Sequence, residues 1–276
     1  MKDRTNRRLL IIFGLCFLLS FGAIGIGFLG IVGLLDSGIV ATVRDWIEPI
    51  VSIRTDEPRV DTVGQDGPSA VDLEATRLAE QEQSISAIHA DWPTVFEEAF
   101  VVNDEVWPEF EEEDDLAKLS VAFVSGVYRW EAQANEGFIW WSYPDMESLT
   151  DFYAEVEVIQ VDGDPYGEMG LLFHIDADQF YLFEVSGEYY SLWRSVPDGW
   201  SELIDWTTSD IIRPGDKNLL GVLMLEDQIH LFINDQLVAE LSDTRYASGV
   251  IGLAIGLEEA GDEGTFEFDN LLVTAP

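Results

Sequence analysis

Two acidic residues separated by one apolar residue, Glu155-Val-Glu157, are the first candidates for chemistry in this sequence. Side chains two positions apart lie on the same face of a β-strand, and most glycoside-cleaving sites use two neighbouring carboxyl groups. The chain has 53 acidic residues, so neighbouring acids also arise by chance, and most aspartates and glutamates are solvated surface groups. We therefore assign no catalytic residue and expect a binding protein ahead of an enzyme.

Histidine and cysteine chemistry is poorly supported. The three histidines are His89, His174 and His230, and none has a second ligand at the spacing of a transition-metal site. His174 and His230 fall in expected strands, where a hydrogen-bonded core or edge histidine is commoner than a catalytic one. No glycine-rich phosphate loop precedes a helix. Cys16 is the only cysteine, which excludes an internal disulfide.

Calcium is the one metal for which ligands are plentiful. The segment Asp162-Gly-Asp164 and the region of Asp269 offer hard oxygen ligands, and these three aspartates are the candidate ligands. None of the acidic segments has the spacing of an EF-hand loop. Aspartate and glycine also serve ordinary turns, so plain turn residues are the alternative interpretation.

Adjacent aromatic residues indicate a second kind of site. Sugars stack their apolar faces on aromatic rings. Neighbouring residues on a strand point to opposite faces of the sheet, so in Trp140-Trp141 and in Tyr189-Tyr190 one ring of each pair should face the core and the other should face away from it. Tyr143, Tyr166 and Trp200 lie beside proline or glycine in expected loops, where binding residues concentrate. These seven residues are the candidate carbohydrate contacts; the alternative is that both members of each pair are packed.

The elements that must position these residues are short alternating segments between turn residues, from about Trp92 onward. No alternation of strands with helices occurs, so a doubly wound fold is excluded. We expect an all-β domain over residues 92–276, a two-sheet antiparallel sandwich. Its expected strands are Leu119–Phe123, Val127–Ala132, Phe138–Trp141, Phe152–Val161, Gly170–Ile175, Gln179–Val185, Tyr189–Arg194, Leu219–Leu225, Gln228–Ile233, Val250–Leu257 and Thr265–Val273.

A family resemblance rests on several glycine-containing and apolar runs in a fixed order. They are Gly170-Leu-Leu-Phe-His174, Tyr181-Leu-Phe-Glu-Val185, Asn218-Leu-Leu-Gly-Val222, Gly249-Val-Ile-Gly-Leu253 and Phe268-Asp-Asn-Leu-Leu-Val273. Together they resemble the concanavalin A-like (LamG-type) jelly roll, most closely the bacterial 3-keto-disaccharide hydrolase-like domains, over roughly residues 96–273. Asn234 is followed by Asp235 where the family's hairpin usually carries glycine, and both residues tolerate positive φ.

The resemblance implies a lectin-like module that binds glycan or cell-envelope polymer. A glycoside hydrolase is the alternative from another class, although the E-x-D-x-x-E signature of the laminarinase-like branch is absent. A structural or assembly role at a surface is the third. The resemblance is far less specific for function than for architecture. Jelly rolls of this superfamily often carry a structural calcium ion, and the resemblance implies no other cofactor.

An uncharged apolar segment, Leu9–Leu35, precedes all of this and is long enough for a transmembrane helix. Four basic residues lie before it in the tail of residues 1–8, which predicts a cytoplasmic amino terminus and an extracytoplasmic carboxy-terminal domain in the cell membrane. A cleaved signal peptide is the alternative, but its apolar region would be shorter and followed by small residues. We expect a single-pass membrane protein anchored in the lipid bilayer.

Residues 36–91 are expected to hold a juxtamembrane segment, an acidic linker and a short helical stalk. Val71, Leu78, Ile85 and Trp92 fall seven apart, a thin seam through which copies could associate. Four of the 14 basic and one of the 53 acidic residues precede the apolar segment, so the remainder carries a net charge of about −42. Such a surface repels phosphates, which excludes nucleic acid as a partner.

Overall fold

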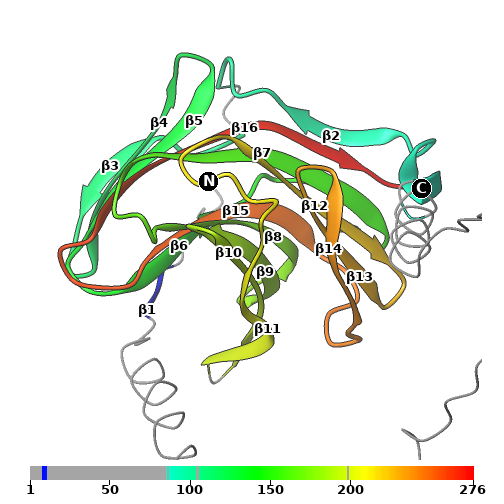
Figure 1. The fold of residues 1–276 in the computed structure, drawn as a ribbon. Coiled ribbons are helices and arrows are strands. Elements are labelled where there is room, and N and C mark those ends of the chain that lie inside the picture. The colour runs from blue at the N-terminus through cyan, green and yellow to red at the C-terminus, as the bar shows by residue number, and fades with distance from the viewer. Residues whose placement is uncertain (1–7, 11–84, 86, 104–105, 198) are drawn as a thin grey trace, which may run out of the picture. The chain divides into compact units, whose positions relative to one another are not determined.

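In a computed structural model, the structure describes residues 8–10, 85, 87–103, 106–197 and 199–276. They form two antiparallel β-sheets whose inner faces pack against each other (Figure 1). The all-β sandwich expected from the alternating sequence is confirmed. No helix among these residues is long and apolar enough to cross a bilayer.

The seven-stranded sheet has the spatial order β1 (Arg8–Leu10), β6 (Phe138–Ser142), β15 (Val250–Leu257), β8 (Glu168–Asp176), β9 (Gln179–Ser186), β10 (Tyr189–Val196) and β11 (Gly199–Thr208). The central strands carry side chains that are buried on both faces, and β8 and β9 have a single exposed residue each. This sheet therefore has buried side chains on both faces, of which only one meets the other sheet.

The nine-stranded sheet forms the other layer, in the order β14 (Gln236–Ser242), β13 (Gln228–Ile233), β12 (Asn218–Leu225), β7 (Phe152–Gly163), β16 (Glu263–Thr274), β5 (Val127–Ala134), β4 (Ala117–Val124) and β3 (Phe110–Glu113), with β2 (Thr94–Glu98) paired to β16. In β7, core residues alternate with half-buried ones. That pattern is expected when one face is solvated.

The core between the sheets is densely aromatic. Trp130 and Trp140 come from opposite sheets, and their ring centroids lie 4.3 Å apart. Phe268 packs on Trp130 at 4.9 Å, and Phe100 stacks on Tyr128 at 5.3 Å. Aromatic pairs of this kind stabilise the fold beyond what the buried area of the rings contributes. They help to hold together a domain that has no internal disulfide.

Two local expectations are confirmed. The register of β16 against β7 shifts between Asp269 and Leu272, so a bulge changes the facing of the strand, and Asn270 there has φ of 51°. Asn234 and Asp235 have φ of 51° and 67° in the β13–β14 hairpin, so this pair makes the tight turn without glycine.

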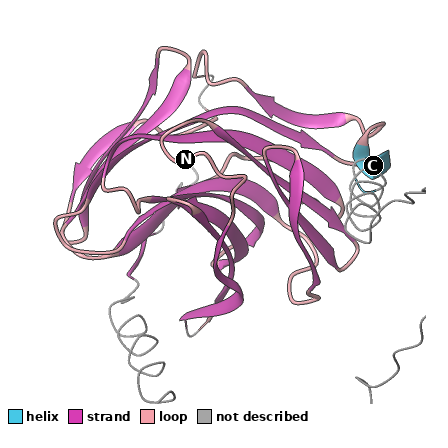
Figure 2. Cartoon of the chain, viewed as in Figure 1, coloured by secondary structure: helices cyan, strands magenta, loops and turns pink. Residues whose placement is uncertain are grey.

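The expectations for the amino-terminal part fall mainly outside the described residues. Leu9 and Leu10, the first residues of the expected transmembrane helix, lie in β1, which pairs with β6; the rest of that segment is not described. Of the expected stalk, residue 85 and residues 87–89 are helical, and Figure 2 shows this short helix in cyan near the carboxy terminus. The acidic linker is not described.

Candidate functional site on the outer face of the seven-stranded sheet

Bulky and acidic side chains gather on the face of the seven-stranded sheet that points away from the core. In β9, Tyr181, Phe183 and Val185 belong to the core cluster, so Glu184 between them points outward. The same alternation places the other members outward from β6, β8 and β10. We define the outer-face site as Trp141, Glu168, Phe180, Glu184, Ser191 and Trp193. This face lies on the side of the sheet opposite to the nine-stranded sheet (Figure 1), and of the six residues only Trp193 is more than 3% exposed.

Small residues form the floor of the outer-face site. Gly256 pairs with Glu168, and a Cβ at position 256 would collide with the Glu168 carboxylate. Gly170 pairs with Glu184, and a Cβ there would lie 2.8 Å from the Cβ of Glu184. A Cβ within 3.0 Å of another atom forces a shift, which is cheap at the far end of a flexible side chain such as Glu168 but not against the Phe183 carbonyl oxygen, 2.5 Å from a Cβ at position 170. The glycines of the sequence therefore make room for these two carboxylic acids.

Glu168 and Glu184 form a coupled pair on neighbouring strands. Met169 pairs with Val185 and Gly170 with Glu184, which places Glu168 and Glu184 diagonally on one face, at a typical spacing of about 7–8 Å. The two residues are 3% and 2% exposed. Burial first, then the charge of Glu184 and Glu258, raises the pKa of Glu168 well above its usual range. Burial raises the pKa of Glu184 to about 8.

A short relay fixes the orientation of Glu184. The indole N–H of Trp193 donates to Ser191 Oγ at 2.8 Å, and the Ser191 hydroxyl donates to Glu184 Oε1 at 3.0 Å. Burial raises the pKa of Glu184, while hydrogen bonds from Ser191 and Trp193 act to lower it, because they favour the charged form. Glu184 is therefore a positioned acid whose proton is held near neutral pH.

Aromatic rings continue the site along the sheet. The Trp141 and Phe180 centroids lie 5.2 Å apart, and Phe180 meets Trp200 edge-on at 5.5 Å. Trp193 and Trp200 are half-buried, whereas Trp141 is buried. The face thus combines aromatic rings with two buried carboxyl groups and a buried hydroxyl, and of these rings Trp193 and Trp200 are the ones that solvent reaches.

The seven aromatic candidates divide into core and surface. Trp140 and Tyr190 point into the core, and this corrects their assignment, since a ligand cannot reach a ring packed between the sheets. Trp141 lies in the outer-face site, and Tyr189 alternates with Tyr190 onto the same face. Trp200 lies beside Phe180, while Tyr143 and Tyr166 are exposed, Tyr166 at 62%.

The candidate calcium ligands serve turns and an ion pair in this structure. Asp162 Oδ1 accepts from the Gly163 amide at 2.9 Å, and Asp164 Oδ2 accepts from the Glu263 amide at 2.8 Å. Asp269 contacts Lys217 Nζ at 3.3 Å. No group of three histidine, cysteine or acidic side chains within the described ranges is arranged to hold a metal ion, so the calcium site stays a prediction.

The sequence pair Glu155 and Glu157 lies on the outer face of the other sheet, where the two acids have separate partners. Glu155 accepts a hydrogen bond from the Tyr153 hydroxyl at 2.7 Å. Glu157 forms an ion pair with Lys217 at 2.6 Å. The facing was predicted correctly, but the two carboxylates are not arranged to act on one substrate.

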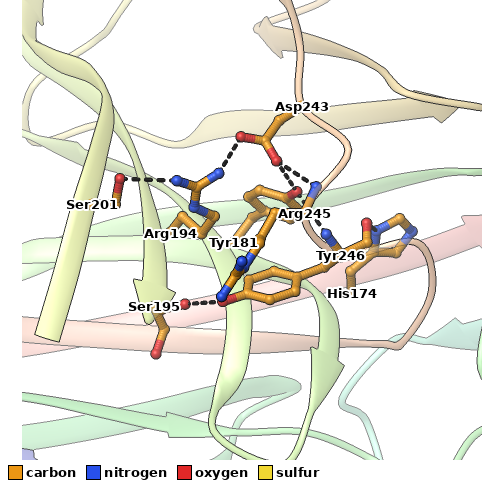
Figure 3. Close-up of polar contacts among 8 residues, drawn as sticks. All are labelled: His174, Tyr181, Arg194, Ser195, Ser201, Asp243, Arg245 and Tyr246. Carbon is orange, nitrogen blue, oxygen red and sulfur yellow. Dashed lines mark hydrogen bonds and ion pairs between the residues drawn. The ribbon is translucent and has the colours of Figure 1, made fainter. Parts of the chain in front are cut away.

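A polar network closes one end of the sandwich (Figure 3). Asp243 accepts from the Tyr181 hydroxyl and from the Arg245 amide, both at 2.7 Å, and pairs with Arg194. Tyr246 donates to the Ser195 carbonyl. All these groups hold the 243–249 loop against β9 and β10, so the network is structural.

His174 belongs to the same end and is the hydrogen-bonded core histidine that the sequence favoured. It is fully buried, and its two ring nitrogens lie 2.9 Å from the Tyr246 carbonyl and 3.0 Å from the Thr150 carbonyl. Burial lowers the pKa of His174, while both carbonyls act to raise it. Gly249 packs directly on the His174 backbone, so the ring connects two loops and faces no open site.

Comparisons with known proteins concern the fold. A structure from work on endo-acting O-glycanases of human gut microbiota matches with a TM-score of 0.50 at 8% identity, covering 66% of this chain and 99% of that one. A carbohydrate-binding module of Bacillus subtilis matches at 0.46 and 19% identity (67% and 95% covered). A galectin-like protein of unknown function from the same organism matches at 0.48 and 13% (66% and 95%).

What these structures share with this chain is the fold. No family model matches the sequence, and no curated protein matches it. The jelly-roll class of sandwich expected from the sequence runs is thus supported by structure alone. The nearer resemblance to 3-keto-disaccharide hydrolase-like domains stays a prediction.

Glu168 and Glu184 were missed as site residues from the sequence. They lie in the consecutive strands β8 and β9, and only the pairing register of these strands brings the two side chains together. One signal was present: Glu184 is the only charged residue in Tyr181-Leu-Phe-Glu-Val185. A lone acid within an apolar strand requires a partner or a function.

Proposed function

We propose that this protein binds carbohydrate through the outer-face site. The observation that carries the proposal is the placement of Glu168 and the hydrogen-bonded Glu184 on a glycine floor, on the same face of the sheet as Trp141 and Trp193. Sugar rings present apolar faces for stacking and hydroxyl groups for hydrogen bonding. Fold likeness to a structure connected with mucin O-glycan cleavage is consistent with this ligand class.

Each part of the site has a task in this proposal. Trp193 supplies a half-buried ring at the edge of the site, and its own N–H is directed to Ser191. The Glu184 carboxyl accepts or donates a hydrogen bond according to its protonation, and its pKa of about 8 makes both forms accessible near neutral pH. Neutral hydroxyl groups can pair with both forms.

Glycoside hydrolysis is the second candidate function, favoured by the coupling of Glu168 with Glu184. Two acids with interacting charges titrate in separate steps, so one can hold a proton as general acid while the other is ionised. If hydrolysis occurs, Glu168→Gln and Glu184→Gln would each abolish the release of reducing sugar. Retained glycan binding in those variants would separate catalysis from binding.

We further propose that the Leu9–Leu35 segment anchors the sandwich at the outer side of the cell membrane, which requires residues 8–10 to leave their pairing with β6. The basic residues at positions 2, 4, 7 and 8 and the uncharged length of the segment support this orientation. An anchored domain with a net charge near −42 would stay soluble beside the membrane and be repelled by anionic headgroups.

The test is binding to a broad panel of oligosaccharides and insoluble polysaccharides. The full chain is held in a polyoxyethylene detergent, because sugar-headed detergents would compete. Wild type is expected to bind at least one glycan, and Trp193→Ala to weaken that binding about tenfold or more, because the variant loses one stacking contact and the orientation of Ser191.

Trp92→Ala is the matched control, since Trp92 lies at the other sheet and its loss should leave glycan affinity unchanged. Circular dichroism confirms that both variants fold. If wild type binds nothing across the panel, or if Trp193→Ala binds as wild type does, the outer-face site is not a carbohydrate site.

A further inference from the structure

A second concave site lies on the outer face of the nine-stranded sheet, away from the outer-face site. It is a cavity of about 460 Å³ that His89 and Ala90 line, at the end of the short helix drawn in cyan near the carboxy terminus in Figure 2. Its size falls within the range of small-molecule sites. The lining residues come from that helix, the segment that follows it, strands β2, β7, β13 and β16, and the β13–β14 hairpin: His89, Ala90, Trp92, Thr94, Tyr153, Glu155, Phe232, Asp235, Leu272 and Thr274.

The walls of this cavity are aromatic. His89 stacks on Tyr153 with ring centroids 3.8 Å apart and an angle of 10°. Trp92 meets His89 edge-on at 6.4 Å, and Phe232 meets Tyr153 edge-on at 6.2 Å. His89 and Trp92 are half-buried, so part of each ring surface stays open. The faces of such rings carry negative potential, which attracts cations.

Two carboxyl groups add negative charge to the same cavity. Glu155 accepts from the Tyr153 hydroxyl, and burial, with the charges of Asp235 and Glu157, raises its pKa. No lysine or arginine of the described chain lines the cavity; Lys217 contacts Glu157 and Asp269 instead. Burial also lowers the pKa of His89, so the imidazole does not neutralise the acids.

An unsatisfied hydroxyl points to a ligand independently of the charges. Thr274 is 9% exposed, and within the described structure its Oγ1 has no hydrogen-bond partner. Thr274 pairs with Thr94 and Tyr153 in the sheet, and it lines the cavity with both. Buried hydroxyl groups are normally hydrogen-bonded, so this atom is available for a ligand.

We propose that this cavity, the acidic aromatic cavity, binds a small organic cation with apolar substituents, of the quaternary ammonium type. The aromatic walls and the two carboxylates suit a positively charged ammonium group that has no N–H bonds. Thr274 Oγ1 can form a hydrogen bond with a hydroxyl or carbonyl group of the same ligand. Anions are repelled by Glu155 and Asp235. A bare metal ion is a poorer match, because no three acidic, histidine or cysteine side chains in the described ranges converge.

The probe is choline, titrated into the full chain in a polyoxyethylene detergent and followed by calorimetry. Tetramethylammonium, glucose and calcium are titrated separately at matched ionic strength. Wild type is expected to bind choline and tetramethylammonium. Glu155→Gln keeps the shape and the Tyr153 contact but removes a charge, so it should weaken choline binding about tenfold or more.

Glu131→Gln is the matched control, because Glu131 is an exposed residue of the same sheet outside the cavity. The choline affinity of this variant should equal that of wild type. Trp92→Ala should also lose choline, while leaving glycan binding at the outer-face site unchanged. Absence of choline binding, or equal affinity in Glu155→Gln and wild type, overturns the proposal. So does binding of glucose or calcium at Glu155 in place of the ammonium ions.

Discussion

At the scale of single residues, the pair Glu168 and Glu184 carries most of the chemistry that the structure offers. Both acids are buried on the outer face, and Glu184 is held in place by Ser191, which itself accepts from Trp193. Burial favours their protonated forms. Stability should therefore depend on pH in a range where ordinary surface carboxyl groups no longer titrate.

The Glu184→Gln variant tests this dependence. The pKa of Glu184 is about 8 in the folded chain and near 4.5 when unfolded, so the folded state binds more protons between these values. The stabilisation of the folded state by the protonated Glu184 carboxyl is fully present below about pH 4.5 and is lost as pH rises through about 8. The melting temperature of wild type should fall from pH 5 to 8.5, and that of Glu184→Gln should fall much less.

Glu131→Gln controls for the general repulsion of a highly acidic chain, since Glu131 is exposed and its variant should follow the wild-type curve. Thermal unfolding at matched ionic strength is the measurement. Parallel curves for wild type and Glu184→Gln would show that Glu184 titrates as an exposed acid, and the assignment of a protonated pair would fail.

At the scale of elements, the 243–249 loop connects β14 of the nine-stranded sheet to β15 of the seven-stranded sheet and is held by polar contacts to the seven-stranded sheet. Asp243 binds Tyr181 and Arg194 from β9 and β10, and Tyr246 donates to Ser195 while its carbonyl meets His174. The side chains of Arg194 and Asp243 are 21% and 11% exposed. An ion pair of this burial matters mainly through the cost of leaving one partner alone.

Asp243→Asn is expected to lower the free energy of unfolding by about 2 kcal/mol, since the Arg194 charge and the Tyr181 hydroxyl lose a charged acceptor. Denaturant unfolding measures the change through its midpoint, with the slope unchanged. The exposed control Glu131→Gln should stay within about 0.5 kcal/mol of wild type. An Asp243→Asn midpoint equal to that of the control would mean that the network does not hold the loop.

At the scale of the whole molecule, periodicity predicted much of the fold and little of the site. Strands such as β9, with Tyr181 and Phe183 facing one way and Phe180 and Leu182 the other, were readable because an apolar run is bounded by turn residues. Strand β3 was missed because Glu111 to Glu113 have the composition of a solvated loop, and β14 because its residues are only half-buried. Charge on an edge strand discourages pairing with other chains.

The candidate site was harder to predict because it depends on register. Trp141 was identified from its adjacency to Trp140, which requires only alternation. Glu168 and Glu184 meet only after β8 and β9 pair in one particular register, and a shift of one residue in either strand would turn its acid to the core. Two neighbouring acids in the sequence, Glu155 and Glu157, were visible but have separate partners.

Topology is a property of the whole chain that a protease can measure. We expect protease added to intact cells or spheroplasts to digest the sandwich, because the basic tail keeps the amino terminus inside. A cytoplasmic reporter protein serves as the control for lysis. Protection of the sandwich, or release of a soluble form cut near Asp36, would contradict an uncleaved anchor with an outer domain.

Calcium is the second whole-molecule prediction. If one or more acidic turns bind calcium, millimolar calcium should raise the melting temperature. At a hundredfold excess of calcium over Kd, the free energy of unfolding should increase by about 2.7 kcal/mol. Magnesium and sodium at matched ionic strength control for screening of the negative charge. Equal melting temperatures in calcium and in chelator would leave Asp162, Asp164 and Asp269 as turn and ion-pair residues alone.

The central claim, carbohydrate binding on the outer face of the seven-stranded sheet, is tested most directly by the indole N–H signals of the tryptophans. The chain contains nine tryptophans, each with one such resonance, assigned by single Trp→Phe variants. On titration with a glycan selected by panel binding, the signals of Trp141 and Trp193 should shift together and saturate. Shifts confined to Trp92, or no shift at any tryptophan while the glycan remains bound, would contradict the claim.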